Sequence, residues 1–169
     1  RHASEACRCR GGPIATHTVG TIASGAYQTA AARMGGDVDL TCQACPGFVE
    51  FVERGDTDSD QVRVLAQRLL APVREGKVDS LLLGCTHYPF LARTIGEIMG
   101  RDVVLVSSAD ETAFEVRHLL ERSDVARPGG APPVHRFVSS GDAESFAAIG
   151  TRLLGMAMTN VEAHRWDDR

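Results

Sequence analysis

The residue types best suited to chemistry lie together at residues 85–87, with the sequence Cys-Thr-His. They follow a short apolar run, residues 79–84, which is too brief for a helix and is typical of a strand buried on both faces of a parallel sheet. A helix is expected directly afterwards, because Pro89 suits a first helical turn and Gly100 suits a C-terminal stop. These three side chains are therefore expected where a strand ends and a helix begins.

This position favours an anion site that contains an activated thiol. Open α/β sheets bind ligands outside the carboxyl ends of their strands, and a helix N-terminus points N–H groups and its positive dipole end at the same place. The imidazole of His87 can exchange protons with the thiol of Cys85, and Thr86 is placed to hold a carboxylate. The spacing leaves a second interpretation open, in which Cys85 is a small buried apolar residue and His87 lies on the surface.

The remaining sequence predicts strands that alternate with helices, and therefore an α/β fold. Apolar residues recur at helical spacing over 60–71, and Pro72 should end or kink that helix. Ser108 and Glu111 have the spacing of a capping box, and residues 127–133 have the composition of a loop. The expected helices are 24–34, 60–71, 89–99, 108–121 and 143–154, and the expected strands are 38–44, 79–84, 103–106 and 134–139.

The composition is that of an ordinary globular protein. The chain has 169 residues, of which 43% are hydrophobic and 24% charged, and 18 Lys+Arg against 22 Asp+Glu give a net charge of −4. A chain of this length can bury roughly 70% of its unfolded surface. No apolar run approaches the ~18 residues of a membrane span, and the acidic balance argues against nucleic acid. We therefore expect neither a membrane nor a nucleic acid among the partners.

Cysteine usage favours a reducing compartment with free thiols, since the five cysteines are an odd number. Residues 1–13 contain no apolar segment typical of a signal peptide, which favours the cytoplasm. Cys42 and Cys45 have C-x-x-C spacing, so a redox or metal-binding protein remains a less favoured alternative. A structural zinc site needs a second ligand pair, and the spacing of Cys7 and Cys9 is unsuitable for one.

Neither a metal nor a cofactor is expected. Five histidines share no metal-ligand spacing and are interpreted as surface or loop residues: His2, His17, His118, His135 and His164. Trp166 and the acidic residues 167–168 are expected to form an unstructured terminus.

The segment LLLGCTHYPFL around Cys85 resembles the second cysteine motif of the bacterial glutamate racemases. Related aspartate racemases usually have another residue after Cys-Thr, so His87 favours glutamate as the substrate. The resemblance covers residues 18–155 and includes three further segments, at residues 18–27, 44–53 and 105–112.

The resemblance implies cofactor-independent interconversion of L- and D-glutamate by two cysteines, which supplies D-glutamate for peptidoglycan. One thiolate removes the α-proton, a second thiol protonates the opposite face, and donors on the substrate carboxylate spread the developing charge. Carried over by motif, Cys85 is one of the two acid/bases and His87 assists it. Thr86, His87 and Thr18 would bind substrate. Glu53 matches a carboxylate that partners the histidine.

The first half of the family's sequence has no counterpart here. That half carries the first catalytic cysteine in an Ala-Cys-Asn-Thr context, and residues 15–17 replace the apolar strand end that normally precedes Thr18. Family members have two facing α/β domains, and the chain returns to the first after completing the second. The resemblance therefore predicts a parallel-sheet, three-layer domain of the aspartate/glutamate racemase type, with the first domain largely missing. The expected divisions are an unmatched segment, 1–13, a second domain, 14–106, and a return segment, 107–169.

Two hypotheses follow from this pattern. The chain alone should not racemise glutamate, because Cys7 and Cys9 lack the buried strand and the Asn-Thr of the missing motif. The apolar faces of helices 108–121 and 143–154 should be exposed and promote self-association, which leaves a homodimer open. A competing hypothesis of another class is a non-catalytic amino-acid or anion-binding fragment that retains the turn at residues 85–88.

Overall fold

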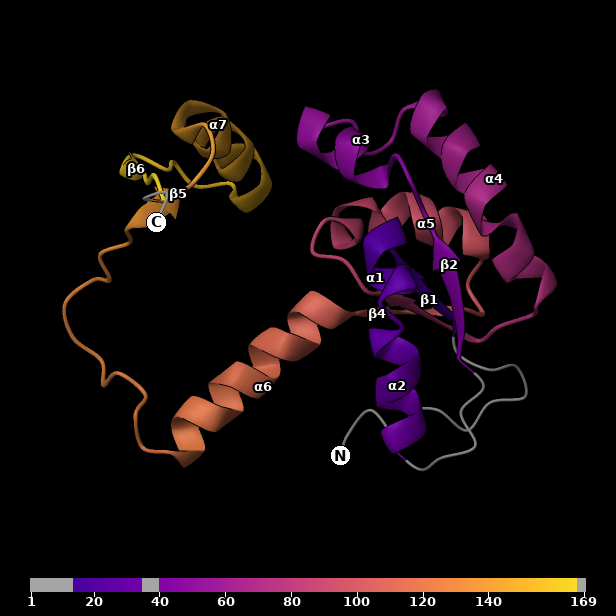
Figure 1. Cartoon of the computed structure of the whole chain (residues 1–169), viewed down its shortest axis with the longest axis horizontal. Coiled ribbons are helices and arrows are strands. Elements are labelled where there is room, and N and C mark those ends of the chain that lie inside the picture. Colours follow the sequence, from indigo (N-terminus) through magenta and orange to yellow (C-terminus); the bar gives the residue numbers. More distant parts are fainter. Residues whose placement is uncertain (1–13, 35–39, 167–169) are drawn as a thin grey trace.

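The computed structural model describes residues 14–34 and 40–166 and has an α/β fold (Figure 1). Four parallel strands form the main sheet in the order β2-β1-β3-β4, and two shorter parallel strands, β5 and β6, form a second sheet. The strands are β1 (Ile14–His17), β2 (Thr41–Ala44), β3 (Ser80–Leu83), β4 (Val104–Ser107), β5 (Phe137–Ser139) and β6 (Val161–Ala163).

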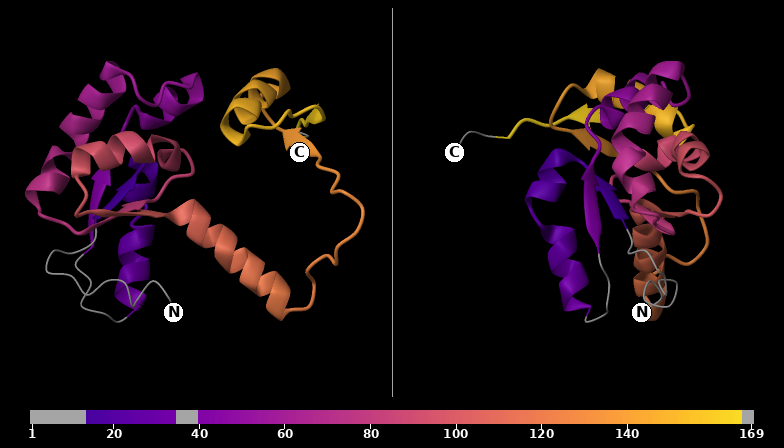
Figure 2. Two further views of the ribbon diagram at one scale, coloured as in Figure 1. Left: turned by 180° about the vertical axis from the view of Figure 1, so that it is seen from behind. Right: turned by 90° about the vertical axis from the view of Figure 1, so that its right-hand side faces the viewer.

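Helices lie on both sides of the main sheet, which confirms the expected three layers. In the right-hand view of Figure 2, α1 and α2 lie on one side of the sheet, and α4 and α5 lie on the other. The helices are α1 (Val19–Ala23), α2 (Ala26–Arg33), α3 (Phe48–Arg54), α4 (Asp60–Glu75), the 3-10 helix η1 (Tyr88–Leu91), α5 (Ala92–Met99), α6 (Ser108–Arg122) and α7 (Ala143–Leu154). None of the helices within the described ranges is both long and apolar enough to cross a membrane.

The hydrophobic core lies between β3 and helices α3 to α5. Val62 and Leu70 of α4 are fully buried, as is Ile95 of α5, and they pack with Leu81 and Leu83 of β3. The helical spacing of the α4 residues therefore predicted the buried face correctly. The other face of β3 is only half-buried, so the expectation of burial on both faces holds for one face only.

The order of the strands reverses between β1 and β3. The chain passes from β1 to β2 on one side of β1, and then crosses to β3 and β4 on the other side. Thr16 of β1 pairs with Leu83 of β3, so the carboxyl ends of these two strands lie level. In open α/β sheets, ligands bind outside the carboxyl ends of the strands at such a reversal. Residues 17–18 and 84–85 are therefore the candidate for a ligand site in this fold.

Helix α4 continues through Pro72 to Glu75, so the helix does not end at the proline, which was one of the two predicted outcomes. Pro72 is exposed and costs one helical hydrogen bond. The next residue, Val73, is 1% exposed, and its packing against the core keeps the last turn helical.

Other boundaries also differ from the predictions. The helix expected at 24–34 begins two residues later, as α2, because Gly25 precedes it with a φ of +64°, and the short helix α1 lies before the expected range. The strand expected at 134–139 begins at Phe137. Residues 88–91 form a 3-10 turn ahead of α5. Ser107, rather than Ser108, caps α6 by accepting a hydrogen bond from the backbone N–H of Asp110. Ser108 instead donates its hydroxyl to the Leu83 carbonyl of the neighbouring strand, at 2.9 Å.

The segment after β4 packs little against the rest of the molecule. Figures 1 and 2 show α6 extending away from the main sheet, with a long connection leading to α7, β5 and β6. The loop predicted at 127–133 lies in this connection. Strand β6 was not predicted, and it pairs with β5 from Phe137↔Val161 to Ser139↔Ala163. Trp166 follows β6 outside any regular element and is 77% exposed; residues 167–168 lie outside the described ranges.

Candidate functional site

Thr18 and Cys85 lie just beyond the ends of the two strands between which the sheet order reverses. The backbone N–H of Gly84 donates to the Thr16 carbonyl at 3.0 Å, which continues the ladder between β1 and β3 by one residue. Cys85 is the first residue after that hydrogen bond and is half-buried at the margin of the core. The structure thus brings together two of the five predicted site residues through backbone pairing.

The turn after Cys85 is anchored by a buried tyrosine. The hydroxyl of Tyr88 donates to the Cys45 carbonyl at 3.0 Å, and the rings of Tyr88 and Phe48 form a T-shaped pair with centroids 5.3 Å apart. The backbone N–H of Phe90 donates to the His87 carbonyl, which closes the 3-10 turn. Because η1 lies between Cys85 and α5, the N-terminus of an α-helix does not follow the thiol directly, contrary to the prediction.

Both ring nitrogens of His87 contact residues that were predicted to belong to the site. Its Nε2 lies 3.4 Å from Oε1 of Glu53 on α3, and its Nδ1 lies 3.3 Å from Oγ1 of Thr86. The His87 side chain is 26% exposed and that of Glu53 is 45% exposed, so solvent reaches the pair. This arrangement can orient the imidazole and pass protons between it and a ligand near Cys85.

Thr18 begins helix α1 as its N-cap. Its Oγ1 accepts a hydrogen bond from the backbone N–H of Thr21 at 3.4 Å and lies 2.9 Å from Oγ1 of Thr21. The cap fixes the threonine hydroxyl at the end of β1, next to the end of β3.

His17 was interpreted as a surface or loop residue, and this prediction is wrong. The residue ends β1 and is 0% exposed. Its Nδ1 lies 2.9 Å from the Gly84 carbonyl, and its ring stacks at a 39° tilt on Tyr27, with centroids 3.8 Å apart. Burial lowers the pKa of His17, and the hydrogen bond with Gly84 opposes that effect. The sequence signal was the glycine at position 84, since glycine beside a strand often marks close approach of another group.

The thiols of the C-x-x-C pair ionise less readily than those of a redox or metal site. Burial raises the pKa of the Cys45 thiol to about 12 and also raises the pKa of Cys42. Both therefore favour the neutral thiol over the thiolate that either chemistry requires. Across residues 14–34 and 40–166, no group of three His, Cys, Asp or Glu side chains could hold a metal ion. Cys7, Cys9 and His2 lie outside the described residues.

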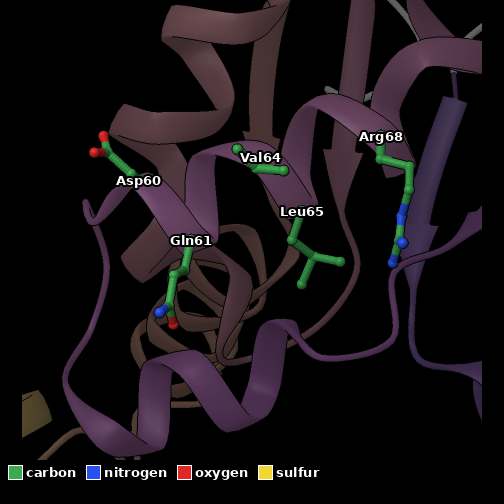
Figure 3. A pocket seen from close by; sticks show the side chains of 5 residues that line it. All are labelled: Asp60, Gln61, Val64, Leu65 and Arg68. Carbon is green, nitrogen blue, oxygen red and sulfur yellow. The ribbon is translucent and has the colours of Figure 1, made fainter.

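A separate cavity of about 440 Å³ lies beside α4 and is lined by Asp60, Gln61, Val64, Leu65 and Arg68. Figure 3 shows Gln61 and Leu65 directed toward the neighbouring helix, with Asp60 at one end of the row of side chains and Arg68 at the other. All five lining residues belong to α4, whereas Thr18 and Cys85 follow strands of the sheet. The cavity is therefore distinct from the candidate site.

Comparison with known proteins gives one consistent result. No family model matches the chain. The chain is 52% identical over 145 residues to the glutamate racemase of Acidothermus cellulolyticus, in an alignment that covers 85% of this chain and 55% of the relative. The chain spans about half the length of the curated relatives it matches.

Two solved structures show the same similarity. A glutamate racemase isoform from Bacillus anthracis superposes with a TM-score of 0.89 at 32% identity, covering 99% of this chain and 62% of that one. The glutamate racemase from Thermus thermophilus, in complex with beta-chloro-D-alanine, gives a TM-score of 0.81 at 32% identity, covering 99% and 61%.

Proposed function

The chain belongs to the glutamate racemase family, in which it matches a C-terminal portion, and we propose that Cys85 supplies one of two acid/bases that interconvert L- and D-glutamate. The observation that carries this proposal is the position of Cys85 and Thr18 at the reversal between β1 and β3. A ligand bound there would meet a thiol and a hydroxyl from adjacent strands.

The proposed reaction moves a single proton at a time. The thiolate of Cys85 takes the α-proton of glutamate onto Sγ, which leaves a flat carbanion-like intermediate. A thiol from another part of the protein donates its proton to the opposite face, which completes the inversion. In the reverse direction, the two cysteines exchange roles. No cofactor is required by this scheme, since each step is a proton transfer between sulfur and carbon.

The neighbouring side chains have distinct proposed roles. His87, oriented by Glu53 at 3.4 Å, assists proton transfer at Cys85. The hydroxyls of Thr86 and Thr18 donate to the substrate carboxylates and so disperse the charge that develops on them. A racemase of this kind would act in the cytoplasm and supply D-glutamate for peptidoglycan.

We further propose that residues 14–106 form one racemase domain, and that residues 107–169 pack on a first domain that is not part of this sequence. None of the 15 described residues of α6 is buried. Strands β5 and β6 form a sheet of two parallel strands, and an isolated two-stranded sheet is at best marginally stable. Both features are expected of a segment that has lost its packing partner, so the chain alone should be inactive.

Complementation in solution tests the function. The purified chain is mixed with the amino-terminal portion of the Acidothermus cellulolyticus racemase, and exchange of the glutamate α-proton in deuterated water is followed by proton NMR. We expect the mixture to exchange the proton and racemise, and each component alone to do neither. Cys85→Ser should abolish the activity and Cys42→Ser, the matched control, should retain it. Full activity of Cys85→Ser would refute the proposed role of Cys85, and racemisation by the chain alone would refute its incompleteness.

Isothermal titration with D-glutamate distinguishes the catalytic proposal from a binding fragment. Binding to the complemented protein without exchange of the α-proton would favour the non-catalytic function. Binding accompanied by exchange that depends on Cys85 supports the racemase.

A further inference from the structure

We propose that His17 is a positioning residue for Cys85, because its imidazole holds the Gly84 carbonyl, in the peptide group that joins Gly84 to Cys85. This inference rests on the proposed function of Cys85 and adds to it a residue of β1 that the family motif does not include. The hydrogen bond sets the direction in which the chain leaves β3, and therefore where the sulfur lies relative to the end of β1.

The hydrogen bond defines the state of the imidazole. A carbonyl oxygen can only accept, so Nδ1 of His17, 2.9 Å from the Gly84 oxygen, must carry the proton. In a neutral ring, Nε2 is then unprotonated, and it is buried without a hydrogen-bond partner among the described residues. Protonation would add a second buried N–H with no acceptor, in keeping with the lowered pKa of His17. The ring is thus a single donor directed at Gly84.

His17 and Gly84 also fit each other in shape. A Cβ atom at position 84 would lie 1.7 Å from Cε1 and 2.0 Å from Nδ1 of His17, far closer than non-bonded atoms can approach. The ring is 0% exposed and lies against Tyr27 at 3.8 Å, so it has little room to move aside. The absence of a side chain at position 84 is therefore a requirement set by His17.

Backbone hydrogen bonds link the end of β1 to the residues just beyond β2 and β3. The carbonyl of His17 accepts a hydrogen bond from Cys45 at 3.1 Å, just beyond β2, while Gly84 donates to Thr16 at 3.0 Å. The end of β1 is therefore fixed on both sides. Because this backbone is fixed, the imidazole attached to it can hold the Gly84 carbonyl, and with it the turn that carries Cys85, in one position.

The reactivity of Cys85 tests the proposal. The full chain is alkylated with iodoacetamide between pH 6 and pH 9, and the rate at each cysteine is followed by peptide mass spectrometry. We expect His17→Leu to slow alkylation of Cys85 by roughly tenfold and to shift its pH profile, with Cys42 as the internal control. His17→Asn, whose amide can donate from a position close to that of Nδ1, should restore most of the rate.

The outcomes separate this inference from the proposed function. A folded His17→Leu chain in which Cys85 reacts at the wild-type rate, with an unchanged pH profile, would overturn the positioning role alone. Sluggish Cys85 in the wild-type chain would instead count against its role as an acid/base.

A second pair of variants distinguishes loss of the His17–Gly84 contact from general misfolding. Gly84→Ala should greatly destabilise the chain, because the new methyl group collides with His17. Combining it with His17→Gly should restore folding, measured by circular dichroism and urea unfolding, while Cys85 remains slow. A double variant no more stable than Gly84→Ala would overturn the proposed fit. Nitrogen-15 NMR of the wild-type ring should show a protonated Nδ1, and a protonated Nε2 would contradict the hydrogen bond.

Discussion

Glu53 and His87 illustrate how a weak contact can matter for chemistry more than for stability. The pair is separated by 3.4 Å and is open to solvent on both sides. Exposed polar contacts between side chains add little to the free energy of unfolding. Their effect should instead be on the orientation of the imidazole beside Cys85.

Glu53→Gln is therefore expected to reduce the racemisation rate of the complemented protein by roughly tenfold, since the imidazole loses the carboxylate that orients it. The urea midpoint should hardly change. Glu50→Gln, on the same helix, is the matched control and should leave the rate intact. An unchanged rate in Glu53→Gln would remove Glu53 from the site.

His17 should make stability depend on pH. Its pKa in the folded chain lies below 6.5, because burial disfavours the charged ring. The unfolded chain therefore binds a proton first as the pH falls, and the stability present above pH 6.5 is progressively lost below it. We expect urea midpoints measured at pH 7 and pH 5 to differ more for the wild-type chain than for His17→Asn. Equal differences would show that His17 does not contribute.

Sequence patterns predicted the cysteine turn but not the histidine behind it. The Cys-Thr-His string follows an apolar run, and both the strand and the turn appear where the string placed them. His17 has no such context, because a single polar residue at the end of a short strand is usually exposed. Its burial depends on the empty space at Gly84, which lies 67 residues away in the sequence. Pairings of this kind are set by tertiary structure and are not visible in local spacing.

At the scale of elements, helical periodicity was a good guide to packing and a poorer guide to boundaries. The apolar face of α4 matches the prediction because the helix has a clear apolar stripe. The span of α7 matches because Asp142 caps its start and Gly155 ends it. Short elements were missed: α1, α3, β1 and β6 contain three to seven residues each. Their formation depends on caps and neighbouring strands more than on propensity.

Pro72 offers a direct test of the packing argument for α4. Replacement by alanine restores an N–H that can bond to the Arg68 carbonyl and removes the ring from an exposed helical position. The unfolded chain gains freedom, which offsets part of the benefit. We expect Pro72→Ala to raise the free energy of unfolding by about 1 to 2 kcal/mol in urea titrations. A destabilised variant would indicate that the proline is needed for the local helix geometry.

At the scale of the whole molecule, the buried core is concentrated before β4, and the residues after it are mostly exposed. The main core joins β3 to α3, α4 and α5. Helix α7 contacts this part through Leu153, which packs against the core, and through Arg152, which donates to the Glu53 carbonyl. Helix α6 instead exposes Phe114, Val116, Leu119 and Leu120. A surface of this kind favours association.

Self-association through α6 is therefore expected. Light scattering of the wild-type chain at increasing concentration should show a mass above that of the 18.1 kDa monomer. Val116→Glu combined with Leu120→Glu should lower the mass, because charge replaces apolar surface on one side of the helix. Val134→Glu, in the exposed loop before β5, is the matched control. A clean monomer at high concentration for the wild-type chain would contradict the expectation.

The rate at which iodoacetamide alkylates Cys85 at pH 7 tests its role as an acid/base most directly. Cys42 is the reference within the same chain, because it is also half-buried and burial raises its pKa. The proposed role predicts that Cys85 reacts several-fold faster than Cys42, and that saturating D-glutamate slows only Cys85 in the complemented protein. If Cys85 reacts no faster than Cys42 and glutamate gives no protection, the thiol at the end of β3 is not the base of a racemase.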